Sequence, residues 1–152
     1  MDKMSEIWRG RFFRFAPLVL WIGVIFYLSS AQGAMSKTSF FMRPLLMFLF
    51  PNSPEETLVI YHGYIRKFAH FAEYAILAFF VFRVFSIKKF QPNIYFVISL
   101  LFVFLIAALD EFNQSFLASR TSSFNDVLLD TLGGLVMLIF LFLFGKYQKR
   151  KQ

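Results

Sequence analysis

The sequence contains no cysteine, which excludes disulfide bonds and thiolate chemistry from any account of its function. Charged side chains are also scarce: they make up 16% of the residues, against 58% that are hydrophobic and 21% that are aromatic. A chain this apolar has too little polar surface for a soluble domain. It also lacks internal repeats and low-complexity tracts, so we expect one compact domain over residues 1–152.

The formal charge of +7 does not indicate a nucleic-acid-binding protein. The basic residues are not interleaved with aromatic residues in one stripe, as a nucleic-acid surface requires. They stand instead in short clusters that flank long apolar runs. This distribution is typical of a membrane protein that follows the positive-inside rule, and no nucleic-acid partner is expected.

Four apolar runs are long enough to cross a bilayer as helices, which takes roughly 20 residues each. We expect these spans at about residues 15–31, 68–85, 92–109 and 125–144. The first run also resembles a signal peptide, because basic residues precede it and Ser29-Ser30-Ala31 offers small residues for cleavage. Its bulky core and the apolar runs that follow favour an uncleaved helix. The sequence thus predicts an all-α integral membrane protein with four transmembrane helices.

The basic residues also predict how the chain is oriented. With the amino terminus in the cytoplasm, eleven of the sixteen Lys and Arg residues fall in cytoplasmic segments and five fall outside. An excess of Lys and Arg marks the cytoplasmic side of a membrane protein. We therefore expect a multi-pass protein of the cell membrane with both termini in the cytoplasm, surrounded by membrane lipids.

The loop between the first two spans is expected on the outside, and part of it is apolar. Ser39 to Phe50 is too short to cross the bilayer and is interrupted by Arg43-Pro44, so it either lies in the interface or re-enters the outer leaflet. After a turn, Ser53 and Glu56 fit a capping box. This box would open a helix that runs towards the second span.

Acidic residues are concentrated on one side of this predicted topology. Seven of the nine Asp and Glu residues fall in or beside the segments expected outside, and most stand at the ends of apolar runs. An unpaired charge there costs roughly 2.5 to 3.5 kcal/mol at midspan depth and less near the interface. These acids must therefore be paired, metal-bound or reached by water. The seven are Glu55, Glu56, Glu73, Asp110, Glu111, Asp126 and Asp130.

The second span opens with a polar face. Arg66, His70 and Glu73 follow helical spacings of four and three, and Lys67 and His70 share a side in the same way. A basic side chain here is explained by snorkelling to the interface. His70 and Glu73 lie two turns deep, where pairing with neighbouring helices is one explanation and function is the better one.

Polar residues also close the third span and open the fourth. Asp110, Glu111 and Gln114 end the third, and Arg120 follows with a planar fork that suits carboxylate or phosphate. The alternative is that the two acids only stop the span in the headgroups. In the fourth span, Ser123 fits the cap of a helix and Asp126 fits an acid in its first turn. A place in a functional site explains Asp126 equally well.

Asp130 is harder to explain as a capping or surface residue. It lies one turn deeper than Asp126 and on the same face of the fourth span. Gly133-Gly134 beside it would permit a close approach of neighbouring helices. We therefore expect a packed polar centre around Asp130.

In this order on four spans, the polar residues resemble the VanZ-like family of bacterial membrane proteins. The motifs are Lys67 with His70-Phe71-x-Glu73-Tyr74, Asp110-Glu111-x-x-Gln114-x-Phe116, and Arg120 with Ser123 and Asp126-Val127, besides Ser29-Ser30 at the end of the first span. The resemblance covers nearly the whole chain. Where the family commonly has Asn one turn after the Asp of the fourth span, this chain has Asp130. The family is named for a protein associated with low-level teicoplanin resistance, which implies a role in the cell envelope.

Two classes of function stay open. In the first, the protein acts on an envelope component from the outer leaflet, with an imidazole and a carboxylate as general acid and base. The catalytic residues would be His70, Glu73, Asp110 and Glu111. The substrate-binding residues would be Lys67, Gln114, Arg120, Asp126 and Asp130, and the substrate a lipid-linked cell-wall precursor or another anionic headgroup. The attacking group would be water activated by a carboxylate or a metal, for which the four catalytic residues offer nitrogen and oxygen ligands.

In the second class, the protein masks, carries or senses the same precursor without turning it over. A proton-coupled transporter that uses Glu73 and Asp130 as a relay is disfavoured, because four short spans would have to oligomerise to enclose a path. The sequence does not indicate a cofactor, the identity of a metal or the oligomeric state.

Overall fold

The computed structural model describes residues 3–30, 33, 35–86, 92–118 and 122–149. The described residues form helices and no strands. The helices are α1 (Lys3–Ser29), α2 (Met35–Leu49), α3 (Glu55–Phe85), α4 (Pro92–Gln114) and α5 (Phe124–Lys149). All except α2 are long and apolar enough to cross a membrane. The predicted all-α fold with four spans is confirmed, although residue 31 of the first predicted span lies outside the described part of the chain.

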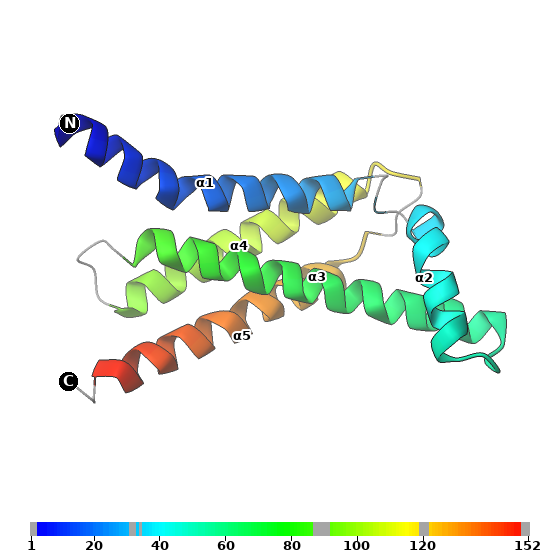
Figure 1. Cartoon of the computed structure of the whole chain (residues 1–152). Coiled ribbons are helices and arrows are strands. Elements are labelled where there is room, and N and C mark those ends of the chain that lie inside the picture. Colours follow the sequence, from blue (N-terminus) through cyan, green and yellow to red (C-terminus); the bar gives the residue numbers. More distant parts are fainter. Residues whose placement is uncertain (1–2, 31–32, 34, 87–91, 119–121, 150–152) are drawn as a thin grey trace.

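The four long helices lie side by side, and α3 occupies a central position among them (Figure 1). It contacts α1, α2, α4 and α5. The beginning of α1 and the end of α5 lie at one end of the bundle, whereas α2 lies at the opposite end. The two ends of the chain thus lie on one side of the bundle, and which side faces the cytoplasm stays a prediction.

Whether a side chain is buried depends on its contact with neighbouring helices rather than on its polarity. Ile25, Leu77, Val103 and Leu138 are fully buried between the helices. Large apolar side chains are nevertheless exposed along every long helix, including Leu20 (70%), Phe68 (71%), Leu101 (57%) and Phe140 (61%). A surface of this kind would aggregate in water, whereas lipid tails solvate it in a bilayer. The structure is therefore that of a multi-pass membrane protein.

Two glycines let α5 pack closely on its neighbours. A Cβ atom on Gly133 would collide with the backbone carbonyl of Phe71 in α3. On Gly134 it would lie 2.6 Å from Val103 Cγ1 in α4. The close contact predicted for Gly133-Gly134 is confirmed, and it holds α3, α4 and α5 together beside Asp130.

The segment around Pro44 is a continuous helix, so the predicted interruption at Arg43-Pro44 is wrong. Proline removes one backbone donor, and a short exposed helix tolerates this loss. Helix α2 lies across the beginning of α3 (Figure 1), burying Leu46 and exposing Phe40 and Phe48. A single crosswise helix with apolar side chains on its free face fits the interfacial alternative rather than a re-entrant segment.

Helix α3 begins earlier than the predicted second span and runs unbroken through it. Its 31 residues rise about 46 Å, whereas a hydrocarbon core is about 30 Å thick. The predicted capping box is wrong, because the N-cap is Pro54 and no side chain caps the helix. Glu55 and Glu56 in the first turn favour the start through the helix dipole instead. Glu55 also forms an exposed ion pair with Arg43 at 3.0 Å.

Candidate functional site

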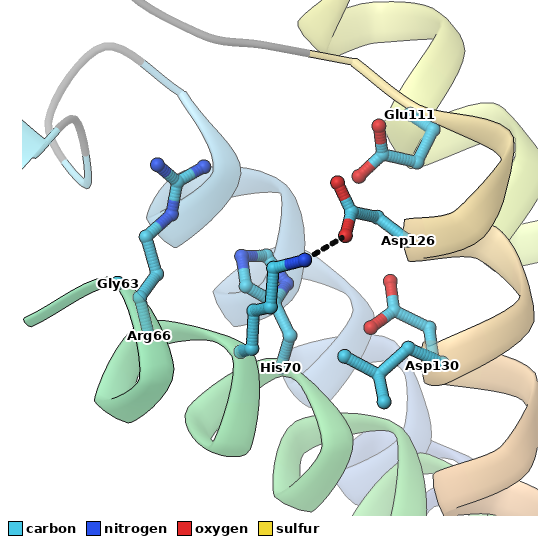
Figure 2. Close-up of a pocket in the computed structure, with 8 residues that line it drawn as sticks. Gly63, Arg66, His70, Glu111, Asp126 and Asp130 are labelled. Atoms are coloured by element: carbon cyan, nitrogen blue, oxygen red, sulfur yellow. Dashed lines mark ion pairs between the residues drawn. The ribbon is translucent and has the colours of Figure 1, made fainter. Parts of the chain in front are cut away.

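A cavity of about 170 Å³ lies among α3, α4 and α5, towards the end of the bundle at which α2 lies (Figure 2). Figure 2 shows Arg66 and His70 on the α3 side, facing Glu111, Asp126 and Asp130 on the α4 and α5 side. The cavity is lined by Gly63, Arg66, Lys67, His70, Glu111, Asp126, Leu129 and Asp130. Polar residues that are far apart in the sequence therefore line one space.

The remaining predicted site residues lie behind or beside this cavity. Asp110 and Gln114 are buried in α4, with 0% and 1% of their surface exposed. Glu73 lines a second cavity, of about 180 Å³, among α1, α2 and α3. Arg120 lies outside the described residues. Arg66 and His70 line both cavities, so α3 separates the two spaces.

The mouth of the first cavity carries an ion pair. Lys67 Nζ of α3 lies 3.5 Å from Asp126 Oδ1 of α5 (Figure 2). The Lys67 side chain is 60% exposed and the Asp126 side chain is 25% exposed. An exposed pair of this kind contributes at most about 1 kcal/mol. An incoming anion can therefore displace Asp126 from Lys67 at small cost.

A carboxylate from another helix completes the cap of α5. Ser123 Oγ accepts the backbone N–H of Asn125 at 3.2 Å, which confirms Ser123 as the cap. The backbone N–H of Ser123 is bound by Glu111 Oε2 of α4 at 3.1 Å. In a capping box, that second bond would come from an acid in the first turn. Glu111 takes this place, and Asp126 pairs with Lys67 instead.

Asp110 is held in one orientation by two donors. Ser29 Oγ of α1 donates to Asp110 Oδ2 at 2.7 Å, and Gln114 Nε2 donates to the same oxygen at 2.9 Å. The contact with Gln114 follows from a spacing of four residues, which puts both side chains on one face of α4. Asp110 thus joins the end of α1 to α4 at the centre of the bundle.

His70 faces an acid of its own helix. Its Nδ1 lies 3.8 Å from Glu73 Oε2, and both side chains are 16% exposed. This spacing is an ion-pair distance rather than a hydrogen bond. Trp21 of α1 donates its indole N–H to the backbone carbonyl of Glu73 at 2.9 Å, which fixes this turn of α3 against α1. His70 lines both cavities, whereas Glu73 lines only the second.

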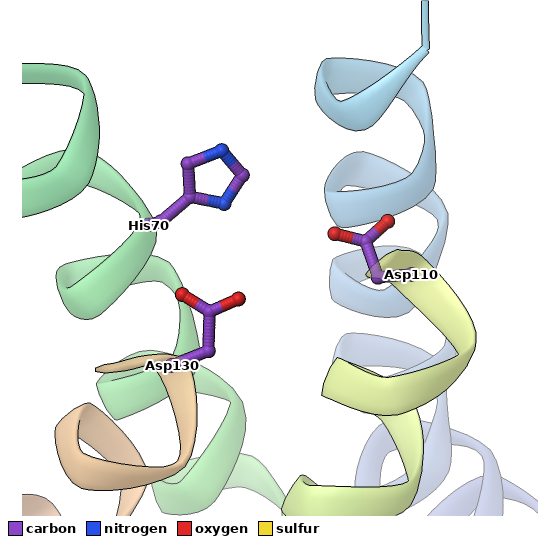
Figure 3. A group of neighbouring side chains, drawn as sticks. All are labelled: His70, Asp110 and Asp130. Carbon is purple, nitrogen blue, oxygen red and sulfur yellow. The ribbon is translucent and has the colours of Figure 1, made fainter. Parts of the chain in front are cut away.

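Asp130 projects between α3 and α4 from the middle of the site. It is 1% exposed, and neither of its carboxylate oxygens has a hydrogen-bond partner in the described part of the chain. His70, Asp110 and Asp130 point towards one another from three helices (Figure 3). One ligand atom from each lies within 4.8 Å of the others. These three residues could hold a metal ion, and they differ from the predicted ligands in that Asp130 replaces Glu73 and Glu111.

His62 is a site residue that the sequence analysis missed. It is 6% exposed and lines the second cavity. Its Nε2 lies 3.1 Å from Thr38 Oγ1, which joins α2 to α3. The available signal was periodicity, because His62, Arg66 and His70 succeed one another at intervals of four residues along one face of α3.

Comparison with known proteins places these motifs in a family context. The family model described as VanZ/LLP1 matches residues 14–145. The matched range contains every candidate site residue from Lys67 to Asp130, and it confirms the resemblance predicted from the motifs. No curated protein and no solved structure matches the chain.

Proposed function

The chain belongs to the VanZ/LLP1 family of membrane proteins, and from this premise we propose that it binds an anionic headgroup of a lipid-linked cell-envelope component. The headgroup enters the cavity among α3, α4 and α5. The candidate ligand class is a cell-wall precursor with a phosphate headgroup. A role in susceptibility to teicoplanin would follow from access to such a precursor.

The observation that carries this proposal is the arrangement of charge in the cavity. Lys67 and Arg66 line the cavity from α3, and His70 lies one turn further along the same helix. Glu111 and Asp130 face them from α4 and α5. Cations near the mouth attract an anion, and the weak pairing of Lys67 with Asp126 leaves its ammonium group available for exchange. His70, Glu111 and Asp130 would then meet the bound headgroup.

The exposed apolar surface of the helices that border the cavity suits the rest of a lipid-linked ligand. Phe68 of α3 is 71% exposed, and Leu128 of α5 is 49% exposed. Each belongs to a helix that borders the cavity. A hydrocarbon chain can follow these side chains within the bilayer while its headgroup occupies the polar space.

His70 and Glu73 are the residues to which we assign proton transfer. Their side chains lie 3.8 Å apart and are neither fully exposed nor fully buried. A general acid or base must reach both its proton and its substrate, and His70 lines the cavity that would hold the headgroup. Asp110, fixed by Ser29 and Gln114, would polarise this group from behind.

Binding is tested with the full chain in neutral detergent and a lipid-linked cell-wall precursor of defined mass. We expect saturable binding to the wild type and about tenfold weaker binding to Lys67→Gln, which corresponds to about 1.4 kcal/mol. Arg43→Gln is the matched control: Arg43 is also an exposed, ion-paired cation, but it does not line this cavity. Equal losses of affinity in both variants would show that net charge alone explains the effect. Absence of binding by the wild type would refute the proposal.

Turnover is measured on the same samples by mass spectrometry of the precursor. If the protein is an enzyme, the wild type changes the precursor's mass and His70→Gln binds it without changing it. If the wild type binds the precursor and its mass stays constant, the masking or sensing alternative is correct. The matching measurement in cells is teicoplanin susceptibility with and without each variant.

A further inference from the structure

The geometry points to a divalent metal site formed by His70, Asp110 and Asp130, with Zn²⁺ or a similar first-row transition ion as the ligand. Each residue comes from a different helix: His70 from α3, Asp110 from α4 and Asp130 from α5 (Figure 3). One ligand atom from each lies within 4.8 Å of the other two. This inference goes beyond the proposed function, because the site requires no headgroup to form.

The spacing of the three ligand atoms suits an ion. A point at the centre of a triangle with sides of at most 4.8 Å lies within about 2.8 Å of every corner, whereas Zn²⁺ takes nitrogen and carboxylate ligands at about 2.0–2.2 Å. Each side chain therefore has to move inward by less than about 1 Å. Small rotations about side-chain bonds supply movements of this size.

Asp130 is the strongest argument for an ion. Its side chain is 1% exposed, both of its oxygens lack a hydrogen-bond partner, and no described basic side chain forms an ion pair with it. The nearby cation Lys67 of α3 is paired with Asp126, which lies one turn before Asp130 on α5. A buried carboxylate without a partner is costly, and a divalent cation would remove that cost.

Of the other two ligands, Asp110 already has the hydrogen bonds that metal ligands need, and His70 has a carboxylate close by. Metal-binding histidines are oriented by a carboxylate or carbonyl at the other ring nitrogen, and metal-binding carboxylates are themselves hydrogen-bonded. Glu73 Oε2 lies 3.8 Å from His70 Nδ1, and a shift of less than about 1 Å would bring the two atoms to hydrogen-bond distance, with Nε2 then left for the ion. Ser29 and Gln114 both donate to Asp110 Oδ2.

The donor set also indicates the class of ion. Imidazole favours Zn²⁺ and its first-row neighbours over Mg²⁺, whereas the absence of cysteine and the carboxylate oxygens disfavour soft ions such as Cu⁺. Three protein ligands leave at least one coordination position open. Because His70 and Asp130 line the first cavity, that position faces the space in which a headgroup oxygen or a water molecule would lie.

The test uses metal alone, with the full chain purified in detergent and stripped by a chelator. We expect about one Zn²⁺ per chain by elemental analysis, and competition by Co²⁺ and Mn²⁺ but not by an equal concentration of Mg²⁺. Bound Co²⁺ should give visible absorption bands that Zn²⁺ abolishes. A wild-type protein that binds no ion when Zn²⁺ is added back after stripping would overturn the site.

Variants then locate the ion. Asp130→Asn has the same shape as the native side chain and should weaken Zn²⁺ binding at least about tenfold, as should Asp110→Asn. Glu73→Gln should weaken it by about tenfold through the orientation of His70, with the Co²⁺ spectrum still present. Asp126→Asn is the control, because it removes an acid from the same helix and cavity but not from the triangle, and it should bind Zn²⁺ like the wild type.

Two outcomes would contradict this assignment even if the protein binds Zn²⁺. Wild-type affinity in both Asp130→Asn and Asp110→Asn would show that the ion lies elsewhere. An equal loss in Asp126→Asn would indicate a diffuse effect of negative charge. Each variant is compared by gel filtration and melting temperature in the metal-free state, so that loss of fold is separated from loss of a ligand. Binding of the precursor is measured separately, and its failure would leave the metal site standing.

Discussion

Glu111 of α4 accepts the backbone N–H of Ser123 at 3.1 Å and thereby completes the cap of α5, the helix that follows it in the chain. The bond spans twelve residues and links the last turn of one membrane helix to the start of the next. A residue expected to serve catalysis therefore also has a structural task. The two roles can be separated, because capping needs only an acceptor oxygen whereas acid–base chemistry needs the carboxyl group.

The first prediction separates these roles of Glu111. Glu111→Ala leaves the Ser123 N–H without its acceptor and should lower the stability by about 1–2 kcal/mol, seen as a lower melting temperature in detergent. Glu111→Gln keeps an acceptor oxygen and should melt close to the wild type while losing turnover or binding. Glu56→Ala, at an exposed site in the first turn of α3, is the control: it should cost less than about 1 kcal/mol through the helix dipole and leave binding and turnover unchanged. A fully active Glu111→Gln would remove Glu111 from the chemistry.

The second prediction concerns the serine that holds Asp110. Ser29→Ala removes one of the two donors to Asp110 Oδ2 and should destabilise the protein by about 1–3 kcal/mol, because a fully buried acceptor loses a hydrogen bond. Ser99→Ala is a matched control, since Ser99 is equally buried but its hydroxyl has no hydrogen-bond partner among the described residues. It should be neutral or slightly stabilising. Equal melting temperatures for the two variants would show that the Ser29 bond contributes nothing.

The third prediction concerns the glycine that brings α5 against α3. Gly133→Ala places a Cβ against the backbone of Phe71, which cannot move like a flexible side chain. The helices must separate, and we expect a loss of about 1–3 kcal/mol with reduced ligand binding, because the cavity residues lie on these two helices. Gly145→Ala in α5 meets nothing within 4 Å and should be neutral or stabilising by up to about 1 kcal/mol. Thermal melting of both variants decides the point.

Hydropathy and charge predicted the four spans and the helical class, because length and apolar composition alone determine which segments cross a bilayer. The motif at Ser53 and Glu56 predicted a helix that opens there, and α3 does begin at Glu55, but its first turns rest on α2 and on the fixed backbone of Pro54 rather than on a capping side chain. The interruption predicted at Pro44 was wrong because the proline removes one backbone hydrogen-bond donor, and a short exposed helix tolerates that loss.

The residues that line the cavity were predictable from the sequence in part, and their pairings less so. Helical spacing puts Asp110 and Gln114 on one face, and the structure agrees. The partner of Glu111 depends instead on how two helices meet, which spacing along one helix does not contain. The grouping of His70 with Asp130 likewise depends on the close approach that Gly133 permits. Helical spacing therefore predicts which polar residues share a face of one helix, but not which residues of other helices they contact.

The fourth prediction uses the pair at the cavity mouth. Asp126→Asn frees Lys67 from its 3.5 Å partner and should tighten binding of an anionic headgroup by up to about fivefold, since an exposed pair is worth at most about 1 kcal/mol. Glu55→Gln frees Arg43 in the same manner but outside the cavity, and it should leave binding unchanged. The comparison is made at low and high salt, because screening should reduce the gain. Tighter binding by both variants would argue against a specific role for Lys67.

The fifth prediction tests which face of the membrane carries the site. The absence of native cysteine permits single-cysteine labelling without background. Asn52, at the α2 end of the bundle, and Asn93, at the start of α4, are both exposed, so Asn52→Cys and Asn93→Cys form a matched pair. In intact cells a membrane-impermeant maleimide should label the first and reach the second only after permeabilisation, because Lys and Arg favour the cytoplasm at the Asn93 end. The reverse pattern would put the cavity on the cytoplasmic face and exclude a ligand that enters from outside.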